Sequence, residues 1–231
     1  MITFDNVHKR YPNGREALSN VTFRVDRGEM VFLTGRSGAG KSTILKLIAL
    51  LERPSRGTVV VAGKNTSALK SRHIPAFRRG IGFVFQDHRL LPDRPVFDNV
   101  ALPLVVADTP LKEIDRRVRA ALDQVGLRGK ERLLPIELSV GEQQRVGIAR
   151  AVVSKPPILI ADEPTGNLDP ALALEVMRLF QRFQDVGTTV VVATHDLHVV
   201  REFGEREIVL DGGRLVDPDA PDPLPHFVAT R

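Results

Sequence analysis

Residues 35–43 read GRSGAGKST, and this stretch decides the fold class. It follows residues 30–34, a short apolar run that predicts a strand, and it opens residues 41–51, whose periodicity predicts a helix. A glycine-rich turn in this place lets the backbone curl so that several N–H groups point inward, and the start of the helix adds its positive dipole. The pattern therefore predicts a phosphate-binding loop in an α/β protein.

The residues of this loop have separate expected roles at a nucleotide. Lys41 reaches the β- and γ-phosphates as a cation, and the hydroxyl of Ser42 is placed to ligate Mg²⁺. A glycine turn that merely closes a strand–helix junction is the alternative, but the full motif in this context favours phosphate binding. The residues expected to contact the nucleotide here are Gly35, Arg36, Ser37, Gly38, Ala39, Gly40, Lys41, Ser42 and Thr43.

An acidic pair supplies what such a loop needs for chemistry. Residues 158–162 read ILIAD, an apolar strand that ends in a carboxylate, and Glu163 follows directly. A carboxylate at the carboxyl end of a strand lies in the crevice beside the phosphate-binding loop. Asp162 can therefore hold the magnesium shell, and Glu163 can polarise the attacking water. The alternative is a solvated Asp–Glu pair before the turn at Pro164.

The composition fits one globular α/β domain with an inserted or appended subdomain. The chain has 231 residues, 42% of them hydrophobic and 26% charged, and a formal net charge of +5 that admits an anionic partner. The absence of cysteine excludes disulfides and cysteine-based zinc sites. No secretory signal is visible at the N-terminus, and apolar runs such as residues 100–107 are too short to span a bilayer. Any membrane association is expected to come through a partner.

Strands and helices alternate along the chain except in one long stretch. Between residues 87 and 157 helical periods dominate, which predicts an inserted helical subdomain at about residues 87–155. The Pro- and Asp-rich tail, residues 217–231, is expected to dock weakly or not at all. Strands are expected at residues 2–7, 22–25, 30–34, 59–62, 81–85, 158–161 and 188–193, and helices at 41–51, 112–125, 141–154 and 171–183.

A second motif resembles that of one ATPase family. Residues 138–145 read LSVGEQQR and resemble LSGGQ, the signature sequence of ABC ATPases, which other P-loop classes lack. Further family motifs follow in the expected order. Tyr11 resembles the aromatic residue that stacks on adenine, and Gln86 resembles the glutamine that senses Mg²⁺ and the attacking water. His195 resembles the switch histidine at the γ-phosphate, and residues 167–169, NLD, resemble the D-loop at the dimer interface.

The resemblance covers residues 1–216 and implies both a fold and an assembly. The implied fold is a P-loop NTPase with a RecA-like core at residues 1–86 and 156–216, an antiparallel β subdomain and the inserted helical subdomain. Two copies are expected to pair on ATP, so that the signature of one copy caps the nucleotide of the other. The implied cofactors are ATP and Mg²⁺.

The resemblance also assigns roles to single residues. The implied catalytic residues are Glu163, His195 and Gln86, and the implied metal ligands are Ser42, Gln86 and Asp162. Nucleotide contacts beyond the phosphate-binding loop are implied for Tyr11, Ser139, Gly141, Glu142 and Asp169.

One position departs from the family pattern. Val140 replaces the first glycine of the signature. If that position needs a positive φ, a β-branched residue there is strained. If the helix start is kept, the N–H of Gly141 can still bind the phosphate of the partner's nucleotide. The departure therefore affects the expected efficiency of this contact and leaves the resemblance to the family unchanged.

Within the family, residues 85–104 and 142–169 are similar to the cell-division branch. That similarity implies an ATP-hydrolysing subunit that drives FtsX, an integral membrane protein, and regulates peptidoglycan hydrolysis across the inner membrane. The implied location is the cytoplasmic face of the bacterial inner membrane at the division septum, with the division protein FtsZ as a further candidate partner. A groove around Leu90, Leu91, Val96 and Phe97 is expected to receive the membrane protein. The alternative for this apolar run is the core of the helical subdomain.

Two alternatives remain open. ATPases of lipoprotein release or drug export share the strings EQQR and ADEPTGNLD, so those strings do not separate them from the cell-division branch. A nucleic-acid ATPase is disfavoured, because the chain has no long coiled-coil insertion and its basic residues are scattered. No nucleic-acid partner is therefore expected.

Overall fold

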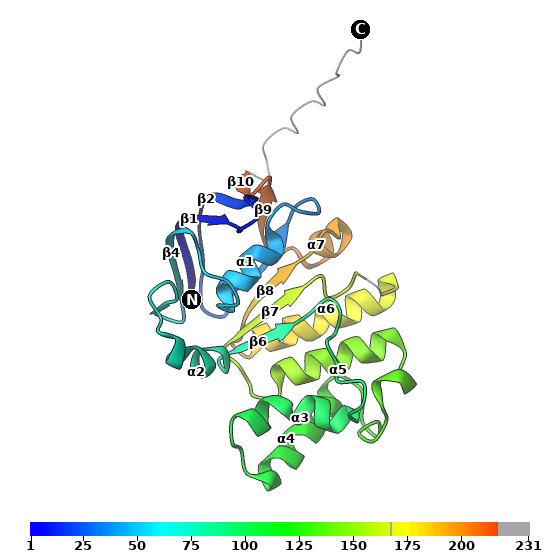
Figure 1. Cartoon of the computed structure of the whole chain (residues 1–231). Coiled ribbons are helices and arrows are strands. Elements are labelled where there is room, and N and C mark those ends of the chain that lie inside the picture. Colours follow the sequence, from blue (N-terminus) through cyan, green and yellow to red (C-terminus); the bar gives the residue numbers. More distant parts are fainter. Residues whose placement is uncertain (167, 217–231) are drawn as a thin grey trace.

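A computed structural model of the chain describes residues 1–166 and 168–216 (Figure 1). Asn167 of the expected D-loop and the tail at residues 217–231 lie outside the described residues. Helix α1 (Lys41–Ile48) lies between two sheets, and its buried side chains pack in one cluster with residues from both of them. This packing anchors the start of α1, where the phosphate-binding loop ends.

The larger sheet carries the sequence motifs at its strand ends. In the described part of the chain its order is β10 (Arg214–Val216), β9 (Arg206–Asp211), β3 (Met30–Thr34), β8 (Thr189–Ala193), β7 (Ile158–Asp162) and β6 (Ile81–Val84). All of these strands are parallel except β10, which pairs antiparallel with β9.

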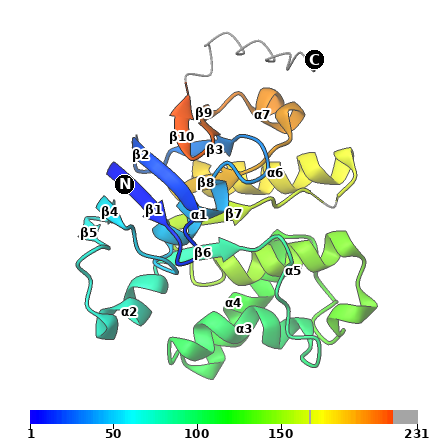
Figure 2. The ribbon, with the colours of Figure 1, turned by 45° about the horizontal axis from the view of Figure 1, so that its top comes forward.

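Both faces of the larger sheet are covered, so its central strands are apolar throughout. In β8, Val190 and Val192 pack into one core cluster, whereas Val191 and Ala193 pack into the other. Alternate side chains of a strand point to opposite faces, and a parallel sheet is normally covered on both. Helices α3 (Val96–Val106), α4 (Leu111–Gln124), α5 (Val140–Val152) and α6 (Pro170–Asp185) contribute to the first cluster, and α1 contributes to the second. In Figure 2, α3, α4 and α5 lie below β6, the strand at one edge of the sheet.

The smaller sheet is antiparallel and lies over α1. Its order is β2 (Glu16–Val25), β1 (Ile2–Arg10), β4 (Arg56–Val61) and β5 (Lys64–Asn65). The buried rings and aliphatic side chains on one face, such as Phe4, Val21 and Val59, face the helix cluster. The turn between β1 and β2 carries Tyr11 and reaches toward the phosphate-binding loop.

The remaining helices lie mainly below the larger sheet in Figure 1. Their bounds are α2 (Ile74–Arg78), α3 (Val96–Val106), α4 (Leu111–Gln124), α5 (Val140–Val152), α6 (Pro170–Asp185) and α7 (Leu197–Phe203), with 3₁₀ turns at Ser71–His73 and Pro135–Glu137. Among the described residues, no helix combines the length and the apolar character that crossing a membrane requires.

The expected α/β P-loop fold is confirmed, and the differences are local. Strand β2 begins at Glu16 rather than at residue 22, because half of its residues are polar and hide the strand pattern. Helix α1 ends at Ile48 instead of residue 51, since Leu50 takes a left-handed conformation with φ of 52°. Strands β5, β9 and β10 and helices α2, α3 and α7 were not located individually by sequence pattern.

Candidate functional site

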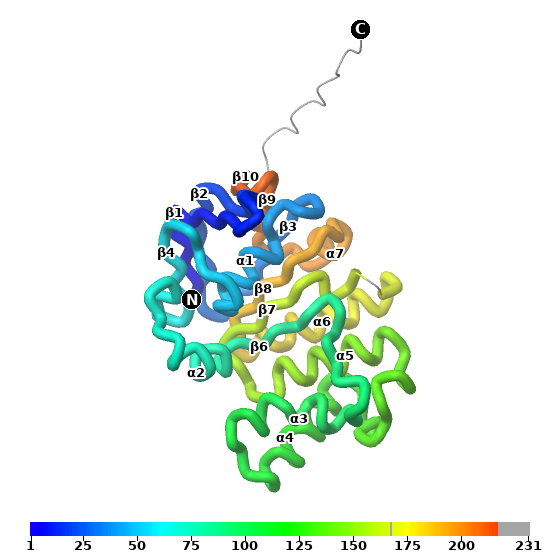
Figure 3. Tube along the Cα trace, in the orientation of Figure 1, coloured from blue at the N-terminus to red at the C-terminus, as the bar shows by residue number. Residues whose placement is uncertain are grey.

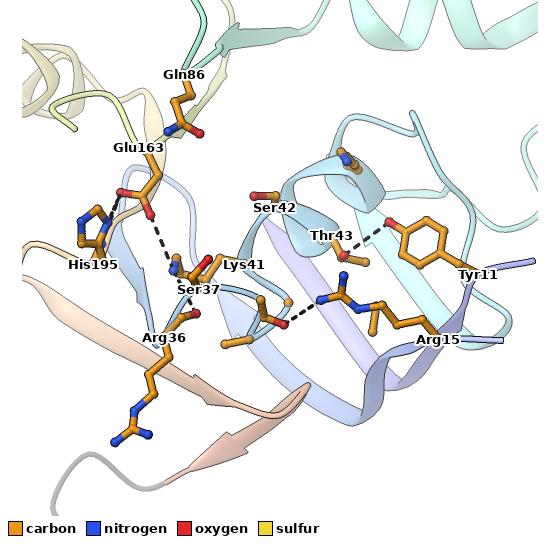
Figure 4. A pocket seen from close by; sticks show the side chains of 15 residues that line it. Tyr11, Arg15, Arg36, Ser37, Lys41, Ser42, Thr43, Gln86, Glu163 and His195 are labelled. Atoms are coloured by element: carbon orange, nitrogen blue, oxygen red, sulfur yellow. Dashed lines mark hydrogen bonds and ion pairs between the residues drawn. The ribbon is translucent and has the colours of Figure 1, made fainter. Parts of the chain in front are cut away.

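A cavity of about 750 Å³ opens over the phosphate-binding loop (Figure 4). Its walls come from the β1–β2 turn, from the loop and first turns of α1, and from the segments that follow β6, β7 and β8. The lining residues are Tyr11, Arg15, Ala17, Arg36, Ser37, Gly38, Ala39, Gly40, Lys41, Ser42, Thr43, Lys46, Gln86, Glu163 and His195. The fold thus gathers residues from five separate parts of the sequence around one space.

Two glycines of the loop are required by its geometry. Gly35 has φ of 133°, and a Cβ there would lie 2.1 Å from the carbonyl oxygen of Leu210. Gly40 has φ of 111°, and a Cβ there would lie 2.8 Å from the carbonyl oxygen of Ala17. Any larger residue would push the loop away from these strands. The glycines therefore keep the loop tight and aim the N-terminus of α1 into the cavity.

The loop lysine is buried and already paired with oxygens. Lys41 Nζ donates to the carbonyl oxygen of Gly35 at 2.7 Å and lies 3.5 Å from Glu163 Oε1. Its side chain is 8% exposed. The cation thus sits at the mouth of the loop, where phosphate oxygens can replace its present partners.

Ser42 and Asp162 form the pair expected at a magnesium site. Ser42 Oγ donates to Asp162 Oδ1 at 3.0 Å. Burial raises the pKa of Asp162, and the neighbouring charge of Glu163 raises it further, while the hydroxyl of Ser42 opposes both. The charged form of Asp162 is therefore held at a cost when no cation is bound.

The donor set fits Mg²⁺. Hydroxyl and carboxylate oxygens are hard ligands, and Mg²⁺ bound with a nucleotide takes one or two of them together with phosphate and water. Gln86 adds an amide oxygen at the same cavity. Within residues 1–166 and 168–216, no group of three or more His, Cys, Asp or Glu side chains could hold a metal alone, so phosphate oxygens would have to complete the shell.

Glu163 and His195 form a second polar pair, across from the loop in Figure 4. His195 Nδ1 lies 2.8 Å from Glu163 Oε2, and the backbone N–H of His195 donates to the same oxygen at 3.3 Å. Glu163 takes a left-handed conformation with φ of 48°, an uncommon state for a residue other than glycine. Its backbone N–H donates to the carbonyl oxygen of Ala193 at 2.9 Å. The carboxylate is thereby directed into the cavity, between Lys41 and His195.

Tyr11 closes the far end of the cavity. Its hydroxyl lies 3.3 Å from Thr43 Oγ1, and the Nζ atom of the buried Lys9 lies 4.9 Å from the ring centroid. The ring is therefore held from the side of β1 and leaves room for a base on the cavity side.

Three lining residues were missed by sequence reasoning: Arg15, Ala17 and Lys46. Arg15 donates to the carbonyl oxygen of Gly38 at 3.2 Å, so a second cation borders the loop. The helical spacing gave a usable signal for Lys46, which lies one turn after Ser42 on the same face of α1. Arg15 is less accessible to pattern reasoning, because it reaches the loop through the turn between β1 and β2.

The signature residues lie elsewhere and do not line this cavity. Ser139 is the N-cap of α5, where its Oγ accepts from the backbone N–H of Glu142 at 3.3 Å. The Glu142 carboxylate accepts in return from the backbone N–H of Ser139 at 2.9 Å and pairs with Lys130. The Lys130 ammonium and the Ser139 N–H lower the pKa of Glu142 to about 2. The helix start is thus fully capped within its own chain.

Val140 and Gly141, neighbours in the signature, differ in exposure: Val140 faces outward and Gly141 faces α6. Val140 begins α5 with ordinary helical geometry, and its side chain is 51% exposed, so the strain considered for a positive φ does not arise. Gly141 is buried, and a Cβ there would lie 2.2 Å from Leu172 Cδ2 of α6. Asp169 caps α6 through a 3.0 Å bond from the N–H of Leu172. Of the predicted nucleotide contacts, Ser139, Gly141, Glu142 and Asp169 do not line the cavity of their own chain, and neither does Gly35 at the base of the loop.

Known proteins are similar to this chain in sequence and in fold. The profile of the ABC transporter family matches residues 18–166. The cell division ATP-binding protein FtsE of Escherichia coli (strain K12) is 56% identical over 215 residues, which are 93% of this chain and 97% of that protein. The FtsE protein of Mycobacterium tuberculosis is 49% identical over 217 residues, 94% of each chain.

Solved structures agree with these relatives. The dimeric structure of MJ0796, a bacterial ABC transporter cassette, has a TM-score of 0.87 and 39% identity, and the alignment covers 94% of this chain and 97% of that one. A post-hydrolysis state of the same cassette, bound to ADP and Pi, has a TM-score of 0.87 at 38% identity, with the same shares covered. Since sequence and fold agree over nearly the whole length, the chain belongs to the ABC transporter family of ATPases, in the branch of the cell-division ATP-binding proteins FtsE.

Proposed function

We propose that the chain hydrolyses Mg²⁺-bound ATP as a pair of identical copies and thereby drives a membrane partner in cell division. The observation that carries this proposal is the meeting of three groups at one cavity: a buried lysine, a hydroxyl–carboxylate pair and a carboxylate–imidazole pair. Phosphoryl transfer from ATP needs a cation on the phosphates, a metal site and a positioned water. The three groups match these needs one to one.

Nucleotide binding follows from the residues around the loop. The adenine stacks on the free face of the Tyr11 ring, and the phosphates take the N–H groups of residues 36–43. Lys41 exchanges the Gly35 carbonyl and Glu163 for β- and γ-phosphate oxygens. That exchange also frees one oxygen of Glu163, so binding prepares the carboxylate for its next role.

Ser42, Asp162 and Gln86 would hold Mg²⁺, which neutralises charge on the β- and γ-phosphates when bound. This chain contributes the position of the three oxygens. Ser42 is fixed by the first turn of α1, Asp162 by the end of β7, and Gln86 by the segment after β6.

Glu163 acts as the general base of hydrolysis. The carboxylate accepts a hydrogen bond from a water whose oxygen attacks the γ-phosphorus, while the bond to the oxygen bridging the β- and γ-phosphates breaks. The proton of the water passes to Glu163 or to the departing phosphate. His195 holds the carboxylate through its 2.8 Å contact and can reach the γ-phosphate from the same side.

A second copy supplies the residues that one copy keeps outside its own cavity. Ser139 and Gly141 reach the γ-phosphate bound by the partner copy, and Glu142 and Asp169 support them at that interface. A serine hydroxyl and N–H groups at the start of a helix suit a phosphate oxygen. The dimeric form of the related MJ0796 cassette supports this arrangement. The division into a core at residues 1–86 and 156–216 and a helical subdomain at about 87–155 is part of the same proposal.

The cell-division role is supported by identity to FtsE proteins along nearly the whole chain. In this role the chain binds the integral membrane protein FtsX at the cytoplasmic face of the inner membrane, at the division septum. Hydrolysis then controls peptidoglycan hydrolysis on the other side of the membrane. FtsZ is a second proposed partner.

The contact surface that we propose for FtsX is smaller than the groove expected from sequence. Val96 is fully buried, and Leu90 and Phe97 pack against the core, so these three belong largely to the interior. Exposed apolar side chains nearby are Leu91 at 39% and Leu102 at 40%. We therefore place the contact on Leu91 and the outer face of α3.

Co-expression with FtsX tests the proposed role. Wild-type chain should co-purify with FtsX in detergent, whereas Leu91→Glu combined with Leu102→Glu should lose FtsX and keep basal ATP hydrolysis. Val186→Glu is the matched control, because Val186 is also exposed but follows α6. Co-purification of wild-type chain with a lipoprotein-release permease instead of FtsX would contradict the cell-division role.

A further inference from the structure

The segment between β6 and α3 contains a strained turn next to Gln86. His88 and Arg89 both take left-handed conformations, with φ of 56° and 46°. Two consecutive residues of this kind are rare outside glycine, because the side chain crowds the backbone. Such a turn persists when neighbouring groups hold it in place.

A single arginine of another helix holds this turn. Arg150 of α5 donates through Nη1 to the carbonyl oxygen of Arg89 at 2.7 Å and through Nη2 to that of His88. The guanidinium is largely buried, and this burial lowers the pKa of Arg150. Both of these hydrogen bonds go to main-chain oxygens, and the negative charge of Asp87 partly opposes the lowering of the pKa. A planar fork of donors suits two adjacent carbonyls in a way that a lysine ammonium does not.

The two ends of the segment are fixed by other contacts. On one side Phe85 links β6 to Gln86, and the ring of Phe85 lies 4.3 Å from the Arg89 guanidinium. On the other side the buried Asn99 accepts from the N–H of Leu91 at 2.7 Å and donates to its carbonyl at 3.1 Å. Figure 3 shows the segment passing α5 on its way to α3. In the middle of the segment, the N–H of His88 donates to the carbonyl oxygen of Phe85 at 3.2 Å and Arg89 pairs with Asp87. Arg150 adds the two hydrogen bonds that tie this middle part to another helix.

We propose that Arg150 is a positioning residue for ATP hydrolysis, which holds the His88–Arg89 turn and so fixes Gln86 at the nucleotide cavity. The inference rests on the proposed role of Gln86. Arg150 lies in the helix that begins with the signature, about 15 Å along its axis from Val140. It therefore links the part of the chain that meets the partner's nucleotide to the loop that senses its own.

The first test compares turnover with nucleotide affinity. Arg150→Met should lower kcat about tenfold and leave KM for ATP within about twofold, since the loss falls on a group that acts in the reaction rather than in binding. Arg150→Lys should fall between Met and wild type. Arg116→Met is the matched control, because Arg116 is 79% exposed on α4 and should behave as wild type.

The second test asks whether strain in the turn is the cause. Glycine adopts a positive φ without crowding, so Arg150→Met combined with His88→Gly and Arg89→Gly should recover most of the lost kcat. The two glycine substitutions alone should lose less kcat than Arg150→Met, because Arg150 still holds the turn although the contact between Arg89 and Phe85 is gone. Hydrogen exchange of the amides of residues 86–91 should be faster in Arg150→Met than in wild type.

Gln86→Ala distinguishes the role of Arg150 from the proposed role of Gln86 on which it rests. Normal turnover in Gln86→Ala would overturn the role of Gln86 and this inference with it. A defective Gln86→Ala beside a normal Arg150→Met would overturn this inference alone. If Arg150→Met unfolds and the glycine substitutions do not restore it, Arg150 is a packing residue and the inference is wrong.

Discussion

The nucleotide cavity and the signature segment differ in how complete they are within one chain. Around the cavity, Lys41 and Ser42 at the start of α1 contact the acidic pair at the end of β7: Lys41 pairs with Glu163, and Ser42 donates to Asp162. At the signature, Ser139 and Glu142 form hydrogen bonds with each other as a helix cap, and none of the residues that line the cavity comes from this segment. The first region therefore has its ligand-binding groups assembled within one chain, whereas the signature residues are proposed to contact the nucleotide of a partner copy.

This difference teaches where pairing enters the mechanism. ATP binding should be a property of a single copy, because its contacts are assembled before any partner arrives. Hydrolysis should need a second copy, because Ser139 does not line its own cavity and is proposed to meet the γ-phosphate of a partner copy. A ligand that binds the paired state better shifts the population toward it. Substitutions in the two regions should therefore have separable effects.

The largest effect is expected in the cavity. Lys41→Ala should weaken ATP binding by about 10- to 100-fold, because a hydrogen-bonded cation on the phosphates is lost. Isothermal titration with a non-hydrolysable ATP analogue measures it. Lys46→Ala is the control, since Lys46 borders the same cavity with an exposed side chain and should lose much less. Equal losses in the two variants would show that only net charge matters.

The next effect belongs to the signature. Ser139→Ala should leave ATP binding to a single copy unchanged and lower hydrolysis by roughly 100-fold, as for a lost donor at a transition state. It should also cost about 1 kcal/mol of folding free energy, because Ser139 caps α5. Ser139→Thr keeps the hydroxyl and should retain both properties. Reduced ATP affinity in a dilute single copy would contradict the separation of the two regions.

A smaller effect concerns the charge of Asp162. Its pKa is raised in the folded chain, so its stabilising contribution is present below the unfolded value of 3.8 and is lost as pH rises through the folded value. At neutral pH the charge therefore opposes folding. Asp162→Asn should raise the melting temperature of the nucleotide-free chain by roughly 2–4 °C while removing the added stability that Mg²⁺ gives with ATP. A lower melting temperature without nucleotide would contradict this assignment.

Much of the cavity could be predicted from sequence because its chemistry is local. Short runs of sequence contain the glycine-rich loop, the strand that ends in Asp162, and Glu163 beside it. Their residue types alone predict phosphate binding, magnesium binding and activation of water. Arg15 and Arg150 could not be found in this way, since each acts through a contact with a backbone carbonyl far along the chain. Val96 was expected at a surface groove but is buried, because helical periodicity alone did not place the start of α3.

The smallest effect is expected at Val140. Since Val140 already has helical geometry, Val140→Gly relieves no strain and should lower stability by about 1 kcal/mol or less. ATP binding to a single copy should not change. The rate of hydrolysis against protein concentration should shift, because the exposed side chain lies at the proposed interface. A large fall in melting temperature would identify Val140 as a packing residue.

The pairing of two copies around ATP is tested most directly by Glu163→Gln in size-exclusion chromatography with light scattering. The amide cannot take the proton of the water, so hydrolysis should fall by about 10²- to 10⁴-fold while Lys41, Ser42 and Asp162 still hold the nucleotide. The variant should elute as a dimer with Mg²⁺ and ATP and as a monomer with ADP. A variant that hydrolyses ATP at the wild-type rate, or that stays monomeric with ATP bound, would contradict the proposed mechanism.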